Sequence, residues 1–264
     1  DTTLAQIAAE ELGVDSSLIV VRGVDTDVSP FDAGSYASSG TYVTGLAAKN
    51  AATELREKIC AKAAQMWDVD AADVVFDGQY VRLSDERAAR EQNRYLTLRD
   101  FANLCVKNIA GGDALTSHAS ACLPVSPPPF MAGIAEVEVD KATGKVTVVD
   151  YAAAVDCGTV INEALARVQA EGGIAQGIGH ALYEIVEHDE RGRLRTGNFM
   201  SYKLPTRLDI GSIRVAFEPS YEPTGPFGAK SIGEVVINTP LAAVASGVAH
   251  ATGHQVRSLP ITPE

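Results

Sequence analysis

Residues 225–234 place three glycines, a lysine and a terminal glutamate within ten residues, in the order Gly-Pro-Phe-Gly-Ala-Lys-Ser-Ile-Gly-Glu. Glycines this closely spaced let a backbone approach a bulky group at φ values that other residues avoid. An apolar helical pattern follows, so the stretch predicts a tightly held loop that can aim the carboxylate of Glu234. The same spacing also fits a surface loop with a helix-capping acid, and the stretch alone leaves both interpretations open.

The composition is that of a globular protein without nucleic-acid or membrane partners. The 264 residues can form one large domain or two of ordinary size, and they are 46% hydrophobic and 21% charged. A net charge of −12 disfavours binding to nucleic acid or to an anionic membrane. No run of about 20 apolar residues predicts a transmembrane helix. The helical pattern starts directly after Asp1, which favours a fragment or a processed piece of a longer chain.

The cysteines and histidines do not predict a metal centre. The four cysteines are widely spaced and form no CxxC pair, which argues against a zinc ribbon or an iron–sulfur ligand set. Such spacing is typical of reduced thiols in the cytoplasm. His180 and His188 lack the HExxH context of a zinc site. We therefore expect no metal ligands among the side chains and a cytoplasmic location.

Apolar periodicity predicts an α+β fold with antiparallel hairpins. Helices are expected over 2–12, 42–67, 98–107, 162–183 and 241–252, and strands over 17–21, 74–76, 80–83, 132–140, 145–154 and 212–218. Asp77-Gly78 and Ala142-Thr143-Gly144 predict hairpin turns, and the charged segment 84–94 is expected to be solvated. Segment 110–131 is the expected boundary between an N-terminal and a C-terminal lobe.

Two further stretches carry functional signals. Residues 34–41 are small and hydroxylated and precede a helix, which suits a phosphate-bearing ligand but also fits a plain loop. Residues 169–179 place four glycines in an expected helix, at about 1 kcal/mol each relative to alanine. Close approach of another helix or of a flat ligand would compensate, and the pattern leaves both open.

Four motifs occur in order, over residues 156–162, 169–179, 197–202 and 225–234. Together they resemble the second, C-terminal molybdopterin-binding domain of the large subunit in the xanthine dehydrogenase and aldehyde oxidase family of molybdenum hydroxylases. The resemblance spans nearly the whole chain. It implies one α+β domain over 1–264, two-lobed at about 1–120 and 121–264, with mixed or antiparallel sheets and packed helices.

The resemblance also implies residue roles. Glu234 matches the catalytic glutamate, a general base on a molybdenum-bound hydroxyl that attacks an electrophilic carbon of the substrate. Gln169 matches a glutamine that contacts the cofactor, and Lys230 and Ser231 would lie beside the metal. The loop that wraps the pterin and its phosphate is matched by Tyr36, Ala37, Ser38, Ser39, Gly40 and Thr41.

The implied cofactor is molybdopterin with molybdenum, in a dinucleotide form such as molybdopterin cytosine dinucleotide. The implied partners are a first molybdopterin-binding domain, a 2Fe-2S domain or subunit and an FAD domain or subunit, in an assembly that can also be homo-oligomeric. The segment 25–32 resembles the bacterial xanthine dehydrogenase branch, which favours hydroxylation of a small purine-like N-heteroaromatic substrate. Aldehyde oxidation, carbon monoxide oxidation, aromatic acyl-CoA dehydroxylation and a non-catalytic docking role remain as alternatives.

Overall fold

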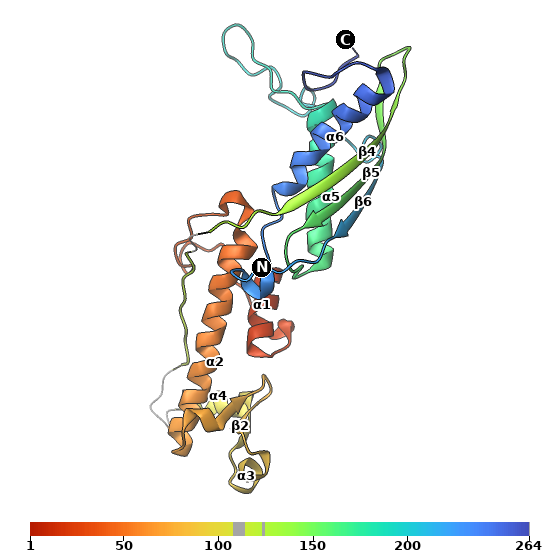
Figure 1. Ribbon diagram of the computed structural model, residues 1–264. Helices are drawn as coiled ribbons and strands as arrows, with labels where there is room; N and C mark the ends of the chain where they lie inside the picture. The colour runs from red at the N-terminus through yellow and green to blue at the C-terminus, as the bar shows by residue number, and fades with distance from the viewer. Residues whose placement is uncertain (108–113, 123–124, 264) are drawn as a thin grey trace. The chain divides into compact units, whose positions relative to one another are not determined.

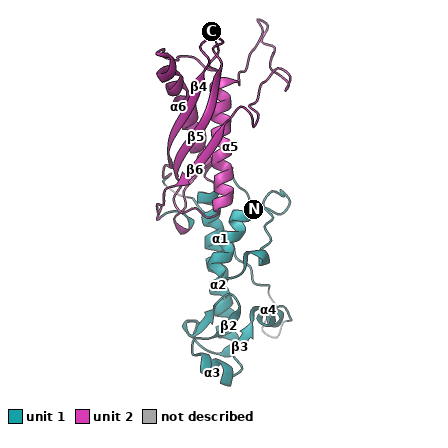
Figure 2. Cartoon of the chain, turned by 90° about the vertical axis from the view of Figure 1, so that its right-hand side faces the viewer, with its two compact units in different colours: residues 1–34, 40–125, 224–226 teal, residues 35–39, 126–223, 227–264 magenta. Residues whose placement is uncertain are grey.

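The computed structural model describes residues 1–107, 114–122 and 125–263, which form two compact units (Figure 2). The first unit contains residues 1–34, 40–125 and 224–226, and the second contains residues 35–39, 126–223 and 227–264. Each unit therefore takes a short segment from the part of the chain that mostly forms the other. The lobes expected at 1–120 and 121–264 stay a prediction, and the boundary segment 110–131 lies partly outside the described residues.

Helices α1 to α4 and a small sheet form the first unit (Figure 1). Helix α1, Thr2–Leu12, packs on α2, Gly45–Trp67, and a π-helical segment, η3, Gly40–Thr44, leads into α2. The antiparallel sheet has the order β1-β2-β3, and its neighbours are α2, α3 and α4. The bounds are Val74–Phe76 for β1, Tyr80–Leu83 for β2, Tyr95–Thr97 for β3, Glu86–Glu91 for α3 and Leu98–Val106 for α4.

The prediction of a strand over 17–21 is wrong. A 3₁₀ turn, η1, Ser16–Leu18, stands there instead, and the Asp15 side chain accepts a hydrogen bond from its backbone. The side chains of Leu18 and Val20 are 68% and 80% exposed. The β-branched residues therefore do not pack against a neighbouring strand, which is the contact that favours them in sheets. The helices expected over 2–12, 42–67 and 98–107 are confirmed, as is the hairpin at Asp77-Gly78.

A mixed sheet covered by two helices forms the second unit (Figure 1). Strands β4, Phe130–Val139, and β5, Val146–Asp156, form the expected antiparallel hairpin, and β6, Ser212–Phe217, pairs parallel to β5. Helix α5, Glu163–Leu182, and helix α6, Val235–Thr252, pack on each other and on this sheet. The core is apolar and includes Val148, Tyr151, Val155, Ala170, Ile174, Ile178, Val236 and Val244. These layers confirm the α+β class.

The glycines of α5 let α6 approach it closely. A Cβ atom at Gly173 would lie 2.3 Å from Cγ2 of Val236, and one at Gly177 would lie 2.7 Å from Cβ of Pro240. No residue with a side chain fits there without moving α6. Of the two explanations that the sequence left open, packing between helices therefore applies at Gly173 and Gly177.

Helix α6 begins at Val235, six residues before the expected start at Leu241. Pro240 lies inside the helix, where its missing N–H removes one hydrogen bond, and its ring packs on α5. Among the described residues, α6 alone is long and apolar enough to cross a membrane by length and composition. A core helix passes the same test, and α6 packs on β4 and α5. The early start places Glu234 directly at the head of the helix.

Candidate functional site

Glu234 occupies the N-cap position of α6, and its side chain does not cap that helix. The residue is exposed, and its Oε2 accepts a hydrogen bond of 2.9 Å from Oγ of Ser38. The carboxylate thus lies in reach of solvent and ligands while one of its oxygens is held by a loop 196 residues away. The Glu234 carboxylate is therefore oriented by Ser38 and does not serve as a helix cap.

The loop that supplies Ser38 has an unusual backbone. Ala37 and Ser38 have φ values of 50° and 56° in the 3₁₀ turn η2, Tyr36–Ser38. Non-glycine residues in this left-handed region cost of the order of 1–3 kcal/mol each, and such conformations gather at functional sites. Tyr36 is 74% exposed, and Ser39 N–H closes the turn on the Tyr36 carbonyl at 3.1 Å. The strained turn directs the Ser38 hydroxyl towards Glu234.

Gln169 and Gly233 complete this cluster. A Cβ atom at Gly233 would lie 2.7 Å from Ser38 Oγ and 3.9 Å from Gln169 Nε2. The absence of a side chain at Gly233 therefore leaves room for the serine hydroxyl and places the glutamine amide close by. Gln169 is exposed on α5. The structure brings together Ser38, Gln169 and Glu234, three residues that the sequence had singled out separately.

The other predicted residues of the 36–41 loop divide between the two units. Gly40 and Thr41 belong to the first unit, where they begin the π-helical segment η3. Tyr36, Ala37 and Ser39 share the second unit with Glu234. Contact of any of these residues with a cofactor stays a prediction.

Lys230 and Ser231 are buried, with 8% and 9% of their surfaces exposed. The Lys230 ammonium donates a 2.7 Å hydrogen bond to Oδ2 of Asp156 and a 3.3 Å one to the Pro128 carbonyl. It also lies 5.4 Å from the centre of the Phe130 ring. The positive charge of Lys230 is therefore paired with the Asp156 carboxylate. The placement of Lys230 beside a metal stays a prediction.

Asp156 is the ion-pair partner of Lys230, and the sequence did not indicate a site role for it. Burial opposes its ionisation, but hydrogen bonds from Lys230, Ser220 and the Gly158 N–H outweigh that effect and hold the pKa of the Asp156 carboxyl below its ordinary value. The Asp-Cys-Gly turn at 156–158 could have indicated this partner, but it entered the sequence comparison only as part of the motif over 156–162. A buried lysine in a glycine loop requires a nearby acid, and this turn supplies one that is partly buried.

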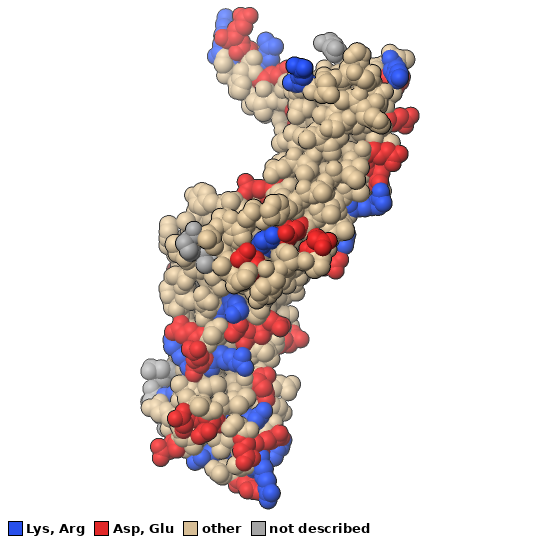
Figure 3. Space-filling model, in the orientation of Figure 1, with Lys and Arg blue, Asp and Glu red and all other residues tan. Residues whose placement is uncertain are grey.

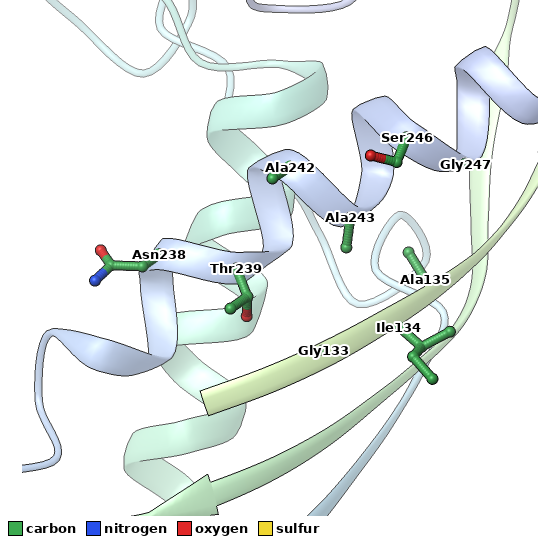
Figure 4. Close-up of a pocket in the computed structure, with 9 residues that line it drawn as sticks. All are labelled: Gly133, Ile134, Ala135, Asn238, Thr239, Ala242, Ala243, Ser246 and Gly247. Carbon is green, nitrogen blue, oxygen red and sulfur yellow. The ribbon is translucent and has the colours of Figure 1, made fainter. Parts of the chain in front are cut away.

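The groove between β4 and α6 is a separate feature (Figure 4). It has a volume of about 550 Å³ and contains no acid, base or thiol. On the face seen in Figure 3, charged side chains are sparse over α6. Its lining consists of Gly133, Ile134, Ala135, Asn238, Thr239, Ala242, Ala243, Ser246 and Gly247. None of these lining residues could act as a general acid or base.

Comparison with known proteins shows the family of the chain. The family model for a molybdopterin cofactor-binding domain matches residues 1–211. The xanthine dehydrogenase molybdenum-binding subunit of Escherichia coli O157:H7 is 35% identical over 266 residues, which cover 100% of this chain and 35% of that protein. The chain thus spans about a third of the length of this relative.

Solved structures show the same fold. Quinoline 2-oxidoreductase from Pseudomonas putida 86 matches with a TM-score of 0.85 and 31% identity, over 99% of this chain and 34% of that one. Reconstituted CO dehydrogenase from Oligotropha carboxidovorans matches with a TM-score of 0.85 and 25% identity, over 99% of this chain and 33% of that one. The fold is therefore shared by proteins whose names indicate different substrates.

Proposed function

The chain belongs to the family of molybdopterin cofactor-binding domains, and from this premise we propose that it is the part of a molybdenum hydroxylase that carries the catalytic base, Glu234. The proposed reaction is hydroxylation of a purine-like N-heteroaromatic compound with oxygen derived from water. The relative named for xanthine and the solved structure named for quinoline support this substrate class. The observation that carries the proposal is the exposed Glu234 carboxylate held by Ser38.

Glu234 acts by taking a proton from the oxygen nucleophile as that oxygen attacks the substrate carbon. The proton is transferred to a carboxylate oxygen, and the Ser38 hydroxyl holds the other oxygen so that the carboxylate keeps its orientation. When bound, the molybdenum cofactor supplies the two-electron oxidation and the site from which water oxygen is delivered. The protein contributes the base and its position.

The residues around Glu234 fit a pterin cofactor with a phosphate. The turn at Tyr36–Ser39 offers hydroxyl and backbone donors in a left-handed conformation, which is the type of backbone that cradles anions. Gly233 leaves a space that a Cβ atom would fill, and the Gln169 amide borders it. The proposed cofactor-binding residues are Tyr36, Ala37, Ser38, Ser39, Gly40, Thr41 and Gln169, with Lys230 and Ser231 beside the metal, and we expect a dinucleotide form.

The remaining parts of the enzyme are proposed from the relatives. Because the chain spans about a third of its relatives, a first molybdopterin-binding domain would supply the other wall of the site. Electrons would leave through a 2Fe-2S protein or domain to an FAD protein or domain. All four cysteines are free thiols, which supports a reducing, cytoplasmic location.

The test is the substitution Glu234→Gln in the complete enzyme, with Glu138→Gln on β4 as a matched control. We expect the Glu234 variant to keep its molybdenum and nucleotide content and to lose turnover by a factor of the order of 10² to 10⁴, the usual contribution of a general base. The control should keep normal turnover. Near-normal turnover in Glu234→Gln would refute the assignment of the base.

A substrate panel tests the second part of the proposal. Purines, quinoline-type heterocycles, aldehydes and carbon monoxide are supplied to the same enzyme preparation, and reduction of the enzyme is followed spectroscopically. Reduction by purines supports the proposed class. Reduction by aldehydes or carbon monoxide alone would replace it with one of the alternatives.

A further inference from the structure

The ion pair between Lys230 and Asp156 anchors the glycine loop four residues before Glu234. The ammonium and the carboxylate are 2.7 Å apart, and their side chains are 8% and 22% exposed. The lysine belongs to the loop, and the aspartate is the last residue of β5. An interaction this well shielded from water is stronger and more directional than an exposed pair.

Backbone contacts bring the same two segments together. Lys230 N–H donates to the Cys157 carbonyl at 2.8 Å, Thr159 N–H donates to the Gly228 carbonyl at 2.9 Å, and Gly158 and Ala229 form an antiparallel bridge. A Cβ atom at Gly158 would lie only 2.3 Å from the Gly228 carbonyl oxygen. The loop is therefore pressed onto the turn that follows β5.

Asp156 joins further parts of the chain to this anchor. Its Oδ1 accepts hydrogen bonds from the Ser220 hydroxyl and from Gly158 N–H, the latter at 3.0 Å. Its Oδ2 binds Lys230. One carboxylate thus fixes the turn after β5, the segment after β6 and the glycine loop relative to the sheet.

Because the segment between Lys230 and α6 is short, the position of Lys230 constrains the position of Glu234. Only Ser231, Ile232 and Gly233 separate the two residues, which limits their separation to about 14 Å at full extension. Gly233 lies against Ser38, whose hydroxyl holds the Glu234 carboxylate. A shift of the loop at Lys230 would therefore reach the Ser38–Glu234 hydrogen bond. A misplacement of about 1 Å at a reacting group can lower the rate by as much as about 10²-fold.

From these contacts we propose that Lys230 and Asp156 are positioning residues that set the place of the Glu234 carboxylate through the glycine loop. The inference rests on the proposed role of Glu234 as the base. Lys230 does not act on substrate or cofactor through its ammonium, because that group is taken up by Asp156 and the Pro128 carbonyl.

The first experiment uses the complete enzyme with Lys230→Met, Lys230→Arg and the double variant Lys230→Met/Asp156→Asn. The double variant leaves no unpaired buried charge, so it keeps the fold if the single variant does not. We expect kcat to fall by roughly 10- to 100-fold in both Met-containing variants, with unchanged KM and molybdenum content. Lys230→Arg should keep more activity than Lys230→Met because it retains a cation for Asp156.

The matched control is the ion pair between Arg214 and Asp150, which joins β6 to β5 in the same unit. Arg214→Met/Asp150→Asn removes a more exposed ion pair, with side chains 70% and 18% exposed, from the same strand and away from the glycine loop. This control should change kcat by less than about twofold. Hydrogen exchange of peptides covering 225–234 gives a readout independent of turnover, and it should accelerate in Lys230→Met/Asp156→Asn and stay unchanged in the control.

A double-mutant cycle separates this inference from the proposed function. If Lys230 acts through Glu234, Lys230→Met lowers the rate of enzyme reduction in the wild-type background and has little further effect in Glu234→Gln. Equal losses in both backgrounds, or normal kcat in Lys230→Met/Asp156→Asn, would overturn the positioning role. If instead Glu234→Gln itself keeps normal turnover, the proposed function fails, and the two failures are thereby distinguished.

Discussion

The Ser38 hydroxyl donates a 2.9 Å hydrogen bond to the Glu234 carboxylate across 196 residues of sequence. Both residues belong to the second unit, although Ser38 lies in a five-residue segment whose sequence neighbours form the first. The contact therefore depends on the strained turn at Tyr36–Ser38, which carries the serine to the head of α6. A proposed general base at a helix start thus receives its orientation from a distant loop rather than from its own helix.

Ser38→Ala should lower turnover without releasing the cofactor. A hydrogen bond to a charged group contributes about 1.5 kcal/mol at the low end of its range, so we expect kcat to fall roughly tenfold. Molybdenum content and KM should stay near their normal values because the carboxylate itself remains. Steady-state kinetics with metal analysis checks this, and Ser246→Ala on the exposed face of α6 is the control. Loss of molybdenum in Ser38→Ala would show instead that the hydroxyl mainly holds the cofactor.

Gly233→Ala should act on the same hydrogen bond by crowding it. The new Cβ atom would lie 2.7 Å from Oγ and 3.0 Å from Cβ of Ser38, so the serine must move. We expect a loss of kcat similar to that of Ser38→Ala. The double variant should lose little more than either single variant, because both changes remove one interaction. Fully multiplied losses in the double variant would contradict this reading.

The sequence predicted the separate parts of the site better than their contacts. The motifs pointed to Glu234, Ser38 and Gln169. No pattern indicated that Gly233 lies close to both Ser38 and Gln169. Long-range contacts of this kind depend on the packing of α5, α6 and the 35–39 segment, which local periodicity does not encode. The direct contact of these residues with a cofactor stays a prediction.

The errors have local physical causes. The helix was expected to start at Leu241, yet α6 begins at Val235 and includes Pro240, whose ring packs against Gly177 of α5. Residues 17–21 look like a strand but lack a partner to pair with. Nor did the sequence indicate the counter-ion that the buried Lys230 ammonium requires, which Asp156 supplies. The hairpins and the helices with clear caps were predicted because their signals are short-range.

Gly173→Ala and Gly172→Ala should have opposite effects on stability, although the two glycines are neighbours on α5. A Cβ atom at Gly173 would lie 2.3 Å from Val236, whereas one at Gly172 would meet nothing within 4 Å. Overpacking at Gly173 should destabilise by about 1–3 kcal/mol. Alanine at Gly172 should be neutral or stabilise by up to about 1 kcal/mol, because alanine is the better helix former. Denaturant midpoints of the two variants check this, and equal midpoints would contradict close packing of α5 on α6.

Acid should remove the contribution of the Lys230–Asp156 pair to stability. Burial opposes ionisation of Asp156, yet hydrogen bonds, that of Lys230 first among them, bring its pKa below the ordinary value of about 3.9. A carboxyl with a lowered pKa in the folded state stabilises the protein fully above its unfolded pKa, and this contribution is lost as the pH falls through the folded pKa.

The apparent melting temperature of the wild type should therefore exceed that of Asp156→Asn at pH 7, and the difference should shrink below about pH 4. Part of the deficit of Asp156→Asn arises because the buried Lys230 ammonium loses its counter-ion. The variant Lys230→Met/Asp156→Asn lacks that charge and serves as the control, since its melting temperature should depend less steeply on pH than that of the wild type. A wild-type advantage that stays constant from pH 7 to pH 3 would show that Asp156 does not titrate with unfolding in this range.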